Sequence, residues 1–332
     1  MFSTQRRQLL AHTALIATAA LFGASATHAQ KPTWKPERPV KLLVGFAPGG
    51  SADTLARLIG EQLGQKLGQP VVVDNVPGAG GNIMAQRLAT SAADGYTLGI
   101  GAAGSMAITF ELNPAVTHYK PESFAPVTML ATQPNVVIVN PNVPATNIAE
   151  LKTYIERTPS VSYGIAGIGI SNHLIAEAML HRMGAKMAAV PYKGAAPVIT
   201  DLMGGHIAMT VDNITTAAAL VKEGKVKALG VTTAKRAPQL PNVPTLQEQG
   251  IKGFDMPTWQ GLFLPAKTPA DIQQAYFDAV QDVLKSASTA EKMAVLGSQP
   301  VVGMKSDDFV KYLANDRKQW AETIKAANIQ PQ

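Results

Sequence analysis

Short apolar runs and longer amphipathic stretches alternate along most of this 332-residue chain, and that order limits its possible folds more than any other feature. The Val- and Leu-rich run at 39–46 predicts a buried strand, and 52–68 carries apolar residues at helical spacing. The same order of strand, loop and helix recurs as far as residue 233. It predicts an α/β fold with parallel sheets and right-handed crossovers.

The chain changes character near residue 255, where one extended segment is followed only by predicted helices. A single strand cannot make a sheet of its own, so we expect this tail to return to the first lobe. The predicted organisation is a first lobe from 30–132 and 255–332, and a second lobe from 133–254. Two α/β lobes joined by two crossings form a cleft between them, which is a common place for a ligand.

The first 29 residues have the layout of a secretory signal. Arg6 and Arg7 precede an apolar run at 14–23, and small residues lead to a predicted cleavage site after Ala29. The apolar run is shorter than the roughly 20 residues that a membrane span needs. We therefore expect an exported chain that is not embedded in the membrane. The paired arginines also fit a twin-arginine signal, and the sequence leaves the choice between this route and Sec export open.

The charge of the chain excludes some classes of partner. Removal of residues 1–29 takes away two of the 29 basic residues and none of the 23 acidic ones, which leaves a net charge of +4. There is no block of Lys and Arg and no basic stripe interleaved with aromatic residues, so we expect no nucleic-acid binding. The chain has no cysteine, which excludes disulfides and cysteine-based metal sites or nucleophiles.

Three glycine-rich junctions follow predicted strands, and ligands of open α/β sheets bind beyond the carboxyl ends of strands. Glycine lets a ligand approach the backbone, and free N–H groups at a helix start attract anions. A plain capped turn is the alternative for any one of these junctions. The candidate residues are Phe46, Ala47, Pro48, Gly49, Gly50, Ser51, Ala52 and Asp53 in the first junction, Gly101, Ala102 and Ser105 in the loop 101–106, and Gly167, Ile168, Gly169, Ile170, Ser171, Asn172 and His173 in the second lobe.

The first and second-lobe junctions are expected to grip one anion from two sides. Neither contains Arg or Lys, so backbone N–H groups and hydroxyls would hold a carboxylate. Ser51 or Asp53 is the expected cap of one helix, and Ser171 or Asn172 of the other. Asp53 has an equally good alternative role, which is to stabilise the helix dipole.

Two further candidates end other predicted strands. Lys193 is the nearest cation to these junctions, and it fits a ligand contact or a plain surface lysine equally well. Asp212 precedes a predicted helix and is a candidate for ordering a loop or binding a ligand hydroxyl.

Motifs for catalysis and cofactors are missing. The glycine loops lack the Lys of a P-loop and the third Gly of a dinucleotide fingerprint, and there is no G-x-S-x-G or H-E-x-x-H pattern. His173 and Glu177 are one helical turn apart, which is more typical of a surface pair than of a metal site. We expect no cofactor, no metal and no enzymatic activity. The alternative is a secreted hydrolase or lyase with an Asp/His pair formed in space.

The sequence resembles the Bug-type extracytoplasmic solute receptors of tripartite tricarboxylate transporters over nearly the whole mature chain. The resemblance rests on "RPVKLLVGFAPGGSADTLAR", "LGQPVVVDNVPGAGGNI", "GIGISNHL", "VPYKGAAPVITDLMGG" and "LPNVPTLQEQG". It implies a two-lobed, periplasmic Venus-flytrap receptor that hands a carboxylated solute to a membrane permease. It also implies a ligand held between 46–53 and 167–173, with Asp212 nearby. A monomer is expected, because such a receptor must close.

The chain departs from the usual pattern of these receptors at several positions. Gly45 stands where Pro is common, and Val76 stands where Arg is common. Ala102, Ala103 and Met106 make the third loop less polar, which favours an apolar ligand such as an aliphatic or aromatic dicarboxylate. A ligand-sensing receptor for a signalling system is the alternative that the sequence does not separate from uptake.

Overall fold

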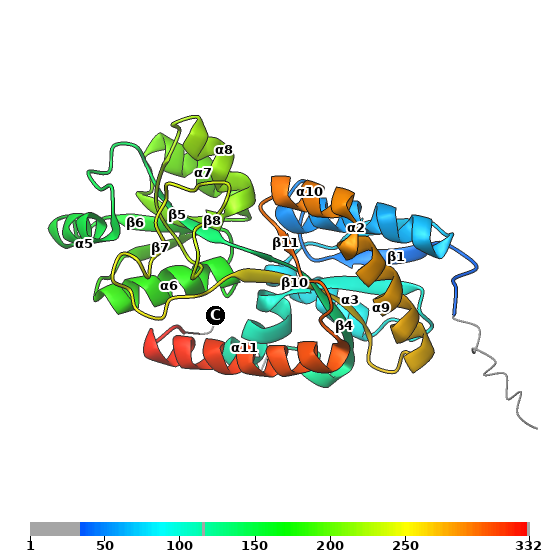
Figure 1. Ribbon diagram of the computed structural model, residues 1–332. Helices are drawn as coiled ribbons and strands as arrows, with labels where there is room; N and C mark the ends of the chain where they lie inside the picture. The colour runs from blue at the N-terminus through cyan, green and yellow to red at the C-terminus, as the bar shows by residue number, and fades with distance from the viewer. Residues whose placement is uncertain (1–33, 115–116, 331–332) are drawn as a thin grey trace, which may run out of the picture. The chain divides into compact units, whose positions relative to one another are not determined.

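The computed structural model describes residues 34–114 and 117–330, so the predicted signal at 1–29 lies outside the described residues. In the described part of the chain, two sheets are each covered by helices (Figure 1). One has six strands in the order β11-β4-β10-β3-β1-β2, and the other has five in the order β7-β6-β8-β5-β9. The predicted α/β class is confirmed.

The strands of the six-stranded sheet come from both ends of the described chain. They are β1 (Val40–Val44), β2 (Val71–Asn75), β3 (Thr97–Ala102), β4 (Phe124–Gln133), β10 (Thr258–Pro265) and β11 (Gln299–Pro300). The five-stranded sheet uses one continuous part of the chain. Its strands are β5 (Asn135–Val139), β6 (Ser162–Ile165), β7 (Ala188–Pro191), β8 (Met209–Asn213) and β9 (Lys227–Val231).

Helices connect these strands as the alternating pattern predicts. Those associated with the six-stranded sheet are α2 (Ser51–Leu67), η1 (Ala79–Gly81), α3 (Asn82–Ala89), η2 (Gly104–Ile108), α4 (Thr109–Leu112), η3 (Pro121–Ser123), α9 (Ala270–Lys285), α10 (Ala287–Val295) and α11 (Ser306–Ala326). Those of the five-stranded sheet are α5 (Ile148–Arg157), α6 (Ser171–Met183), α7 (Ala195–Gly204) and α8 (Ile214–Lys222).

Both sheets are mixed, so the prediction of parallel sheets was only partly right. β1 is parallel to β2 and β3, and β6 is parallel to β7 and β8. However, β10 is antiparallel to β3 and β4, and β5 is antiparallel to β8 and β9. These two strands follow the crossings between the sheets. Only Pro134 separates β4 from β5, so the chain enters the second sheet without a helical crossover.

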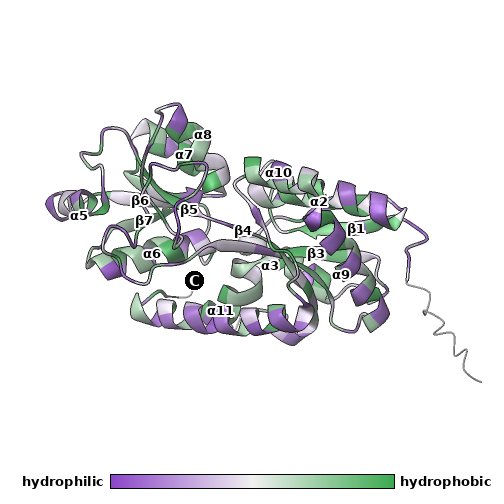
Figure 2. Ribbon diagram, in the orientation of Figure 1, coloured by the Kyte–Doolittle hydropathy of each residue, from purple (hydrophilic) through white to green (hydrophobic). Residues whose placement is uncertain are grey.

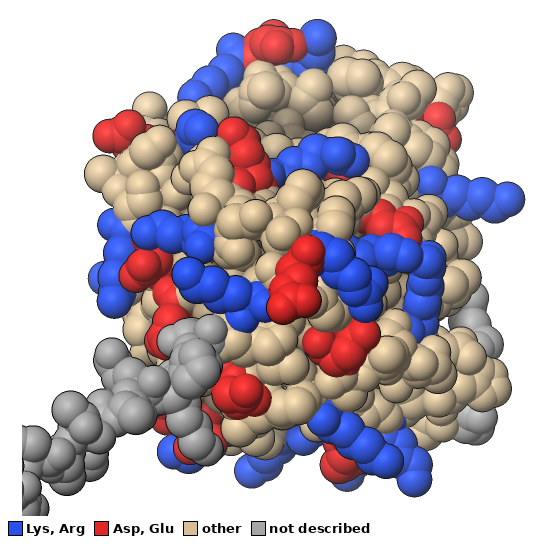
Figure 3. Space-filling model, turned by 90° about the vertical axis from the view of Figure 1, so that its right-hand side faces the viewer, with Lys and Arg blue, Asp and Glu red and all other residues tan. Residues whose placement is uncertain are grey.

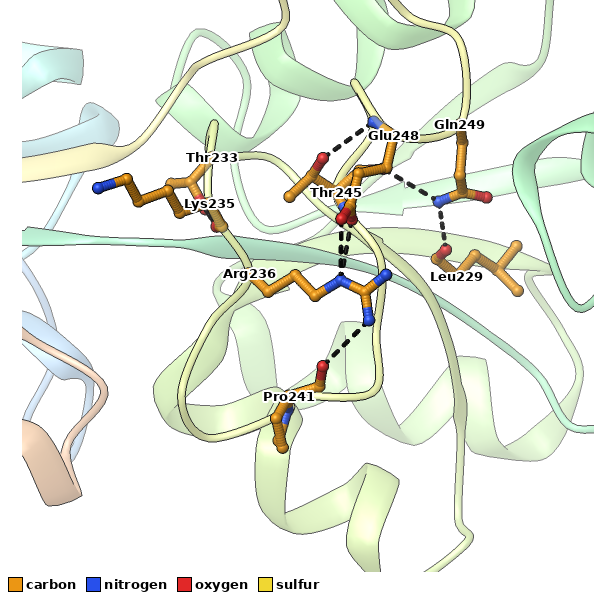
Figure 4. A network of polar contacts seen from close by, with 8 residues as sticks. All are labelled: Leu229, Thr233, Lys235, Arg236, Pro241, Thr245, Glu248 and Gln249. Atoms are coloured by element: carbon orange, nitrogen blue, oxygen red, sulfur yellow. Dashed lines mark hydrogen bonds and ion pairs between the residues drawn. The ribbon is translucent and has the colours of Figure 1, made fainter.

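The second crossing is an irregular segment, 232–257, that is held in place by polar contacts (Figure 4). Arg236 is its centre: Nε lies 2.9 Å from Glu248 Oε2, and Nη1 donates to the carbonyl of Pro241 at 3.2 Å. Gln249 Nε2 donates to the carbonyl of Leu229 at 2.8 Å, which ties the segment to β9. These contacts define the path of the chain as it returns to the first sheet.

The returning strand β10 lies between β3 and β4, inside the first sheet. The expected return of the tail is therefore confirmed. Trp259 of β10 is buried and packs edge-on against Phe309 of α11, with ring centroids 5.8 Å apart. A Cβ at Gly261 would lie 2.4 Å from the Phe309 ring, so glycine makes room for α11.

Hydropathy and charge divide as they do in a water-exposed protein. Apolar residues face the sheets, while the outer side of α11 is polar (Figure 2). On the face drawn in Figure 3, Lys and Arg are interleaved with Asp and Glu and form no single-sign block. Among the described residues, no helix combines the length and hydropathy that a bilayer crossing requires.

Candidate functional site

The first glycine junction is shaped by Asp53. This buried side chain accepts a hydrogen bond from the backbone N–H of Gly49 at 2.9 Å, and Gly49 has a φ of +85° that favours glycine. Helix α2 begins at Ser51 with Gly50 as its N-cap and no side-chain cap. The prediction that Ser51 or Asp53 caps this helix is therefore wrong. The carboxylate reaches back to the loop instead.

Asp53 also gathers two neighbouring polar side chains. Asn75 of β2 donates to Oδ1 at 2.9 Å, and Arg57 Nε donates to Oδ2 at 3.0 Å. Asn75 donates in addition to the carbonyl of Phe46 at 3.0 Å. Burial opposes ionisation of Asp53, but the bonds from Arg57, Gly49 and Asn75 outweigh it and lower the pKa. The first junction is therefore held by an ionised carboxylate before any ligand arrives.

The junction in the second sheet is shaped by His173. Its Nδ1 accepts the backbone N–H of Gly169 at 3.2 Å, and burial lowers its pKa to about 4, so the ring is neutral near pH 7. Nε2 lies 4.0 Å from Glu177 Oε1, but His173 is only 7% exposed, so the expectation of a surface pair is wrong. Helix α6 has Ile170 as its N-cap with no side-chain cap, so neither Ser171 nor Asn172 caps it.

The third junction is not the predicted loop. Strand β3 runs to Ala102, and a π-helical turn, η2, begins at Gly104. Ser105 is 1% exposed, and the expected apolar rim is largely core, because Ala103 and Met106 are buried too. Ala102 alone of the three proposed rim residues is partly exposed.

These junctions meet through a segment that sequence reasoning considered only as a nucleotide motif. A Cβ on Gly80 would lie 3.2 Å from Ile170 Cγ2, and one on Gly104 would lie 3.7 Å from Ile170 Cα. Next to Gly80, Gly81 faces Ser105 and the ring of Phe46. A small cavity of about 20 Å³ lies at this meeting point. Its lining is Ala79, Gly80, Asn82, Gly104, Thr109, Leu112, Asn113, Ile168 and Gly169.

A second link between the two sheets passes through Asn213, the last residue of β8. Its Nδ2 donates to Ser51 Oγ at 3.4 Å, and its Oδ1 accepts from Thr258 Oγ1 at 3.3 Å. Sequence reasoning noted Asn213 only as a strand end and missed Thr258. The neighbouring Asp212 turns toward α8, where Thr216 donates to it, and burial raises its pKa. Lys193 is exposed after β7.

The approach of β1 to the 79–82 segment explains why glycine is needed at position 45. A Cβ at Gly45 would lie 2.8 Å from Gly81 Cα, a backbone atom that cannot rotate away. We expect Gly45→Ala to lower the free energy of unfolding by about 1–2 kcal/mol through overpacking. Urea denaturation measures the loss. A Gly68→Ala control tests a glycine with positive φ but open space, and an undisturbed Gly45→Ala protein would contradict the close approach.

The described residues contain no group of three or more His, Asp or Glu side chains arranged for a metal ion. The ionisable groups at the junctions are each engaged by protein groups: Asp53 by Arg57, and His173 by the backbone of Gly169. What the site offers a ligand is therefore backbone N–H groups at two helix starts and uncharged polar side chains. Such a surface suits a small anion.

Comparison with known proteins agrees with this geometry. The model of the tripartite tricarboxylate transporter family receptor, TctC, matches residues 55–329. BugT of Bordetella pertussis is 32% identical over 87% of this chain and 89% of its own length. A Rhodopseudomonas palustris protein solved with adipate has a TM-score of 0.85 at 36% identity, covering 90% of this chain and 99% of its own.

A second solved structure, MatC from Rhodopseudomonas palustris with bound malate, has a TM-score of 0.81 at 30% identity and covers 87% of this chain and 99% of its own. The fold is that of two-lobed periplasmic binding proteins. With the family match over most of its length, this chain belongs to the TctC family of tripartite tricarboxylate transporter receptors.

Proposed function

We propose that the chain is a periplasmic receptor that binds a carboxylated small molecule between two lobes and delivers it to a membrane permease of the tripartite tricarboxylate type. The lobes would be 30–132 with 255–332, and 133–254. The carrying observation is that uncharged glycine junctions from both sheets converge at Gly80, Gly104 and Ile170. The family and the relatives solved with adipate and malate support a carboxylate.

The physical basis of binding is the start of two helices. The first N–H groups of α2 and α6 have no partner within their helices, and the helix dipole adds partial positive charge there. Ser51 contributes a hydroxyl at the start of α2, beside Asn213 of the other sheet. A carboxylate at this point would bridge the sheets, and closure around it would create the surface that a permease reads.

The enzyme alternative receives no support from the geometry. His173 uses Nδ1 to hold Gly169, and Asp212 is engaged by Thr216. A base that is already committed to the main chain is a poor acceptor for a substrate proton. We propose that the ligand is released unchanged, and that the receptor acts in uptake outside the cytoplasm.

Calorimetry on the chain from residue 30 tests the proposal. Succinate, adipate, malate and an aromatic diacid would be titrated beside amides that replace every carboxylate. At about 100 times its dissociation constant, a ligand should add roughly 2.7 kcal/mol of stability, which thermal unfolding also detects. Binding of an acid but not its amide is the expected result, and chromatography should recover the acid unchanged. Failure of every acid, or turnover of one, would contradict the proposal.

Ser51→Ala provides the matched test of the site. We expect it to weaken the best acid about tenfold, because one hydroxyl partner is lost, and to leave the free energy of unfolding within about 0.5 kcal/mol. Ser91→Ala is the control, since Ser91 bonds only the exposed end of α3, at the carbonyl of Arg87. Equal affinities of Ser51→Ala and the parent protein would place the carboxylate elsewhere.

A further inference from the structure

Two buried amides near the junction of the sheets have polar atoms without a hydrogen-bond partner among the described residues. Gln260 is 7% exposed and its Oε1 is unpartnered. Asn135 is 0% exposed, and both Oδ1 and Nδ2 are unpartnered. Buried polar atoms are almost always paired, because an unpaired one costs about 1–3 kcal/mol. These three atoms therefore call for a partner that is not part of the protein.

Both amides belong to a line of polar side chains that leads to the carboxylate site. Gln260 is opposite Ala102, where β3 reaches the third junction, and Thr258 lies two residues earlier on the same face of β10. Thr258 donates to Asn213, which also contacts Ser51. Asn213 is opposite Asn135 in the β5–β8 pair, so these two side chains share a face. We name Asn135, Asn213, Thr258 and Gln260 the amide line.

The chemistry of the unpartnered atoms selects a ligand group. They are two acceptors, Gln260 Oε1 and Asn135 Oδ1, and one donor, Asn135 Nδ2. A primary carboxamide offers the complement, two N–H donors and one acceptor. A carboxylate has only acceptors and would face two amide oxygens. Exchanging the oxygen and nitrogen of Asn135 leaves the same set, so this argument does not depend on how that amide is oriented.

The charges of the core lead to the same conclusion. No Lys or Arg is among the buried residues of the described chain, so a second carboxylate enclosed at the amide line would have no buried counter-charge. Enclosing an unpaired charge is far more costly than enclosing a hydrogen-bonded amide. A dicarboxylate, which the apolar third loop suggested, therefore fits the amide line less well than its monoamide.

We infer that the amide line recognises a primary carboxamide at the far end of a ligand whose carboxylate is held at the glycine junctions. The preferred ligand class is the monoamide of a dicarboxylic acid. This inference rests on the proposed function, because it needs the carboxylate site to fix the other end of the ligand. It adds a polar specificity determinant that carries no charge.

Calorimetry on the chain from residue 30 tests the inference with succinate, glutarate and adipate, each beside its monoamide. At the chain length that fits best, we expect the monoamide to bind about tenfold more tightly than the diacid. In Gln260→Met the ratio of the two affinities should fall to about one, and Asn135→Leu should act in the same direction. Using the ratio removes effects of a variant on lobe closure.

Gln239→Met is the matched control. Gln239 also has a buried, unpartnered Oε1, but its Nε2 donates to the carbonyl of Ala294 at 2.8 Å, away from the amide line. This variant should keep the ratio of the parent protein. A parallel loss of the ratio in Gln239→Met would mean that the effect is general, and would overturn the inference.

Two other outcomes also decide the matter. If a diacid binds as tightly as its monoamide at every length, the inference falls while the carboxylate receptor stands. If no acid or monoamide binds, both fall together. The ligand-free protein gives an independent readout: Gln260→Met should unfold at the same temperature as the parent protein or higher, because an unpaired amide is removed. A drop of several degrees would show that the amide is already satisfied, and would overturn the inference.

Discussion

Replacement of Asp53 by alanine is expected to lower the free energy of unfolding by about 3 kcal/mol and to weaken carboxylate binding by about tenfold or more. The carboxylate accepts from the main chain of Gly49, from Asn75 and from Arg57 within 3.0 Å. Without it, a backbone N–H and an amide lose their partner in a part-buried place. The first junction then loses the contact that holds it open to a ligand.

Chemical denaturation and calorimetry measure the two effects of Asp53→Ala separately. Asp94→Ala is the control, because Asp94 also pairs with an arginine, Arg38, at 3.2 Å, but both side chains are exposed. Exposed ion pairs contribute roughly 0–1 kcal/mol, so this variant should change little. If Asp53→Ala were no more harmful than Asp94→Ala, the network around Asp53 would have no part in shaping the site.

Local patterning predicts the elements of this fold well, because each strand and helix carries its own periodicity of apolar residues. It also predicts the return of the tail, since one strand alone has no sheet to join. It fails for strand direction. The antiparallel placement of β5 and β10 follows from where the chain crosses between sheets, and Pro134 shows how short such a crossing is. No local signal at these strands reports it.

The site shows the same limit at the level of single residues. Glycine and a polar residue near a helix start predict a junction, but they do not tell a cap from a longer reach. Asp53 holds a loop through Asn75, which is 22 residues away in sequence. The third junction was expected to be a loop because Gly101 and Gly104 punctuate it, yet burial of Met106 draws it into a helical turn. Tertiary contacts decide both cases.

The amide line escaped sequence reasoning for a related reason. Gln260 and Asn135 sit within apolar strands, where a single polar residue carries no motif. Only the register of β10 against β3, and of β5 against β8, brings them into one line with Thr258 and Asn213. Their unpartnered atoms become visible only when burial and hydrogen bonding are considered together.

Replacement of Asp316 by asparagine is expected to stabilise the protein near pH 7 by up to about 3 kcal/mol and to have almost no effect near pH 4. Asp316 of α11 is 8% exposed and accepts from the indole of Trp259 at 2.9 Å. Burial raises its pKa to about 6 from an ordinary 3.8. Two units of pKa correspond to about 3 kcal/mol between protonation states.

The direction of this effect follows from proton binding. The folded state holds the proton of Asp316 more tightly than the unfolded state, so the group favours folding at low pH. That contribution is complete below the unfolded pKa near 4, and it is lost as the pH rises through about 6. Asparagine keeps an oxygen for the Trp259 indole and carries no charge at any pH. The difference in stability between the variant and the parent protein should therefore grow between pH 4 and pH 7.

Urea denaturation at intervals from pH 4 to pH 8 measures this difference curve, in which other titrating groups cancel. Asp308→Asn is the control on the same helix, because Asp308 is exposed and lies 3.4 Å from Lys311, and its curve should be flat. A flat curve for Asp316→Asn would mean that its carboxylate is solvated. The position matters for function, since Trp259 lies one residue after Thr258 of the amide line, and α11 also contacts α6 of the other sheet. A charge that appears at Asp316 above pH 6 would thus destabilise the packing on which closure of the site depends.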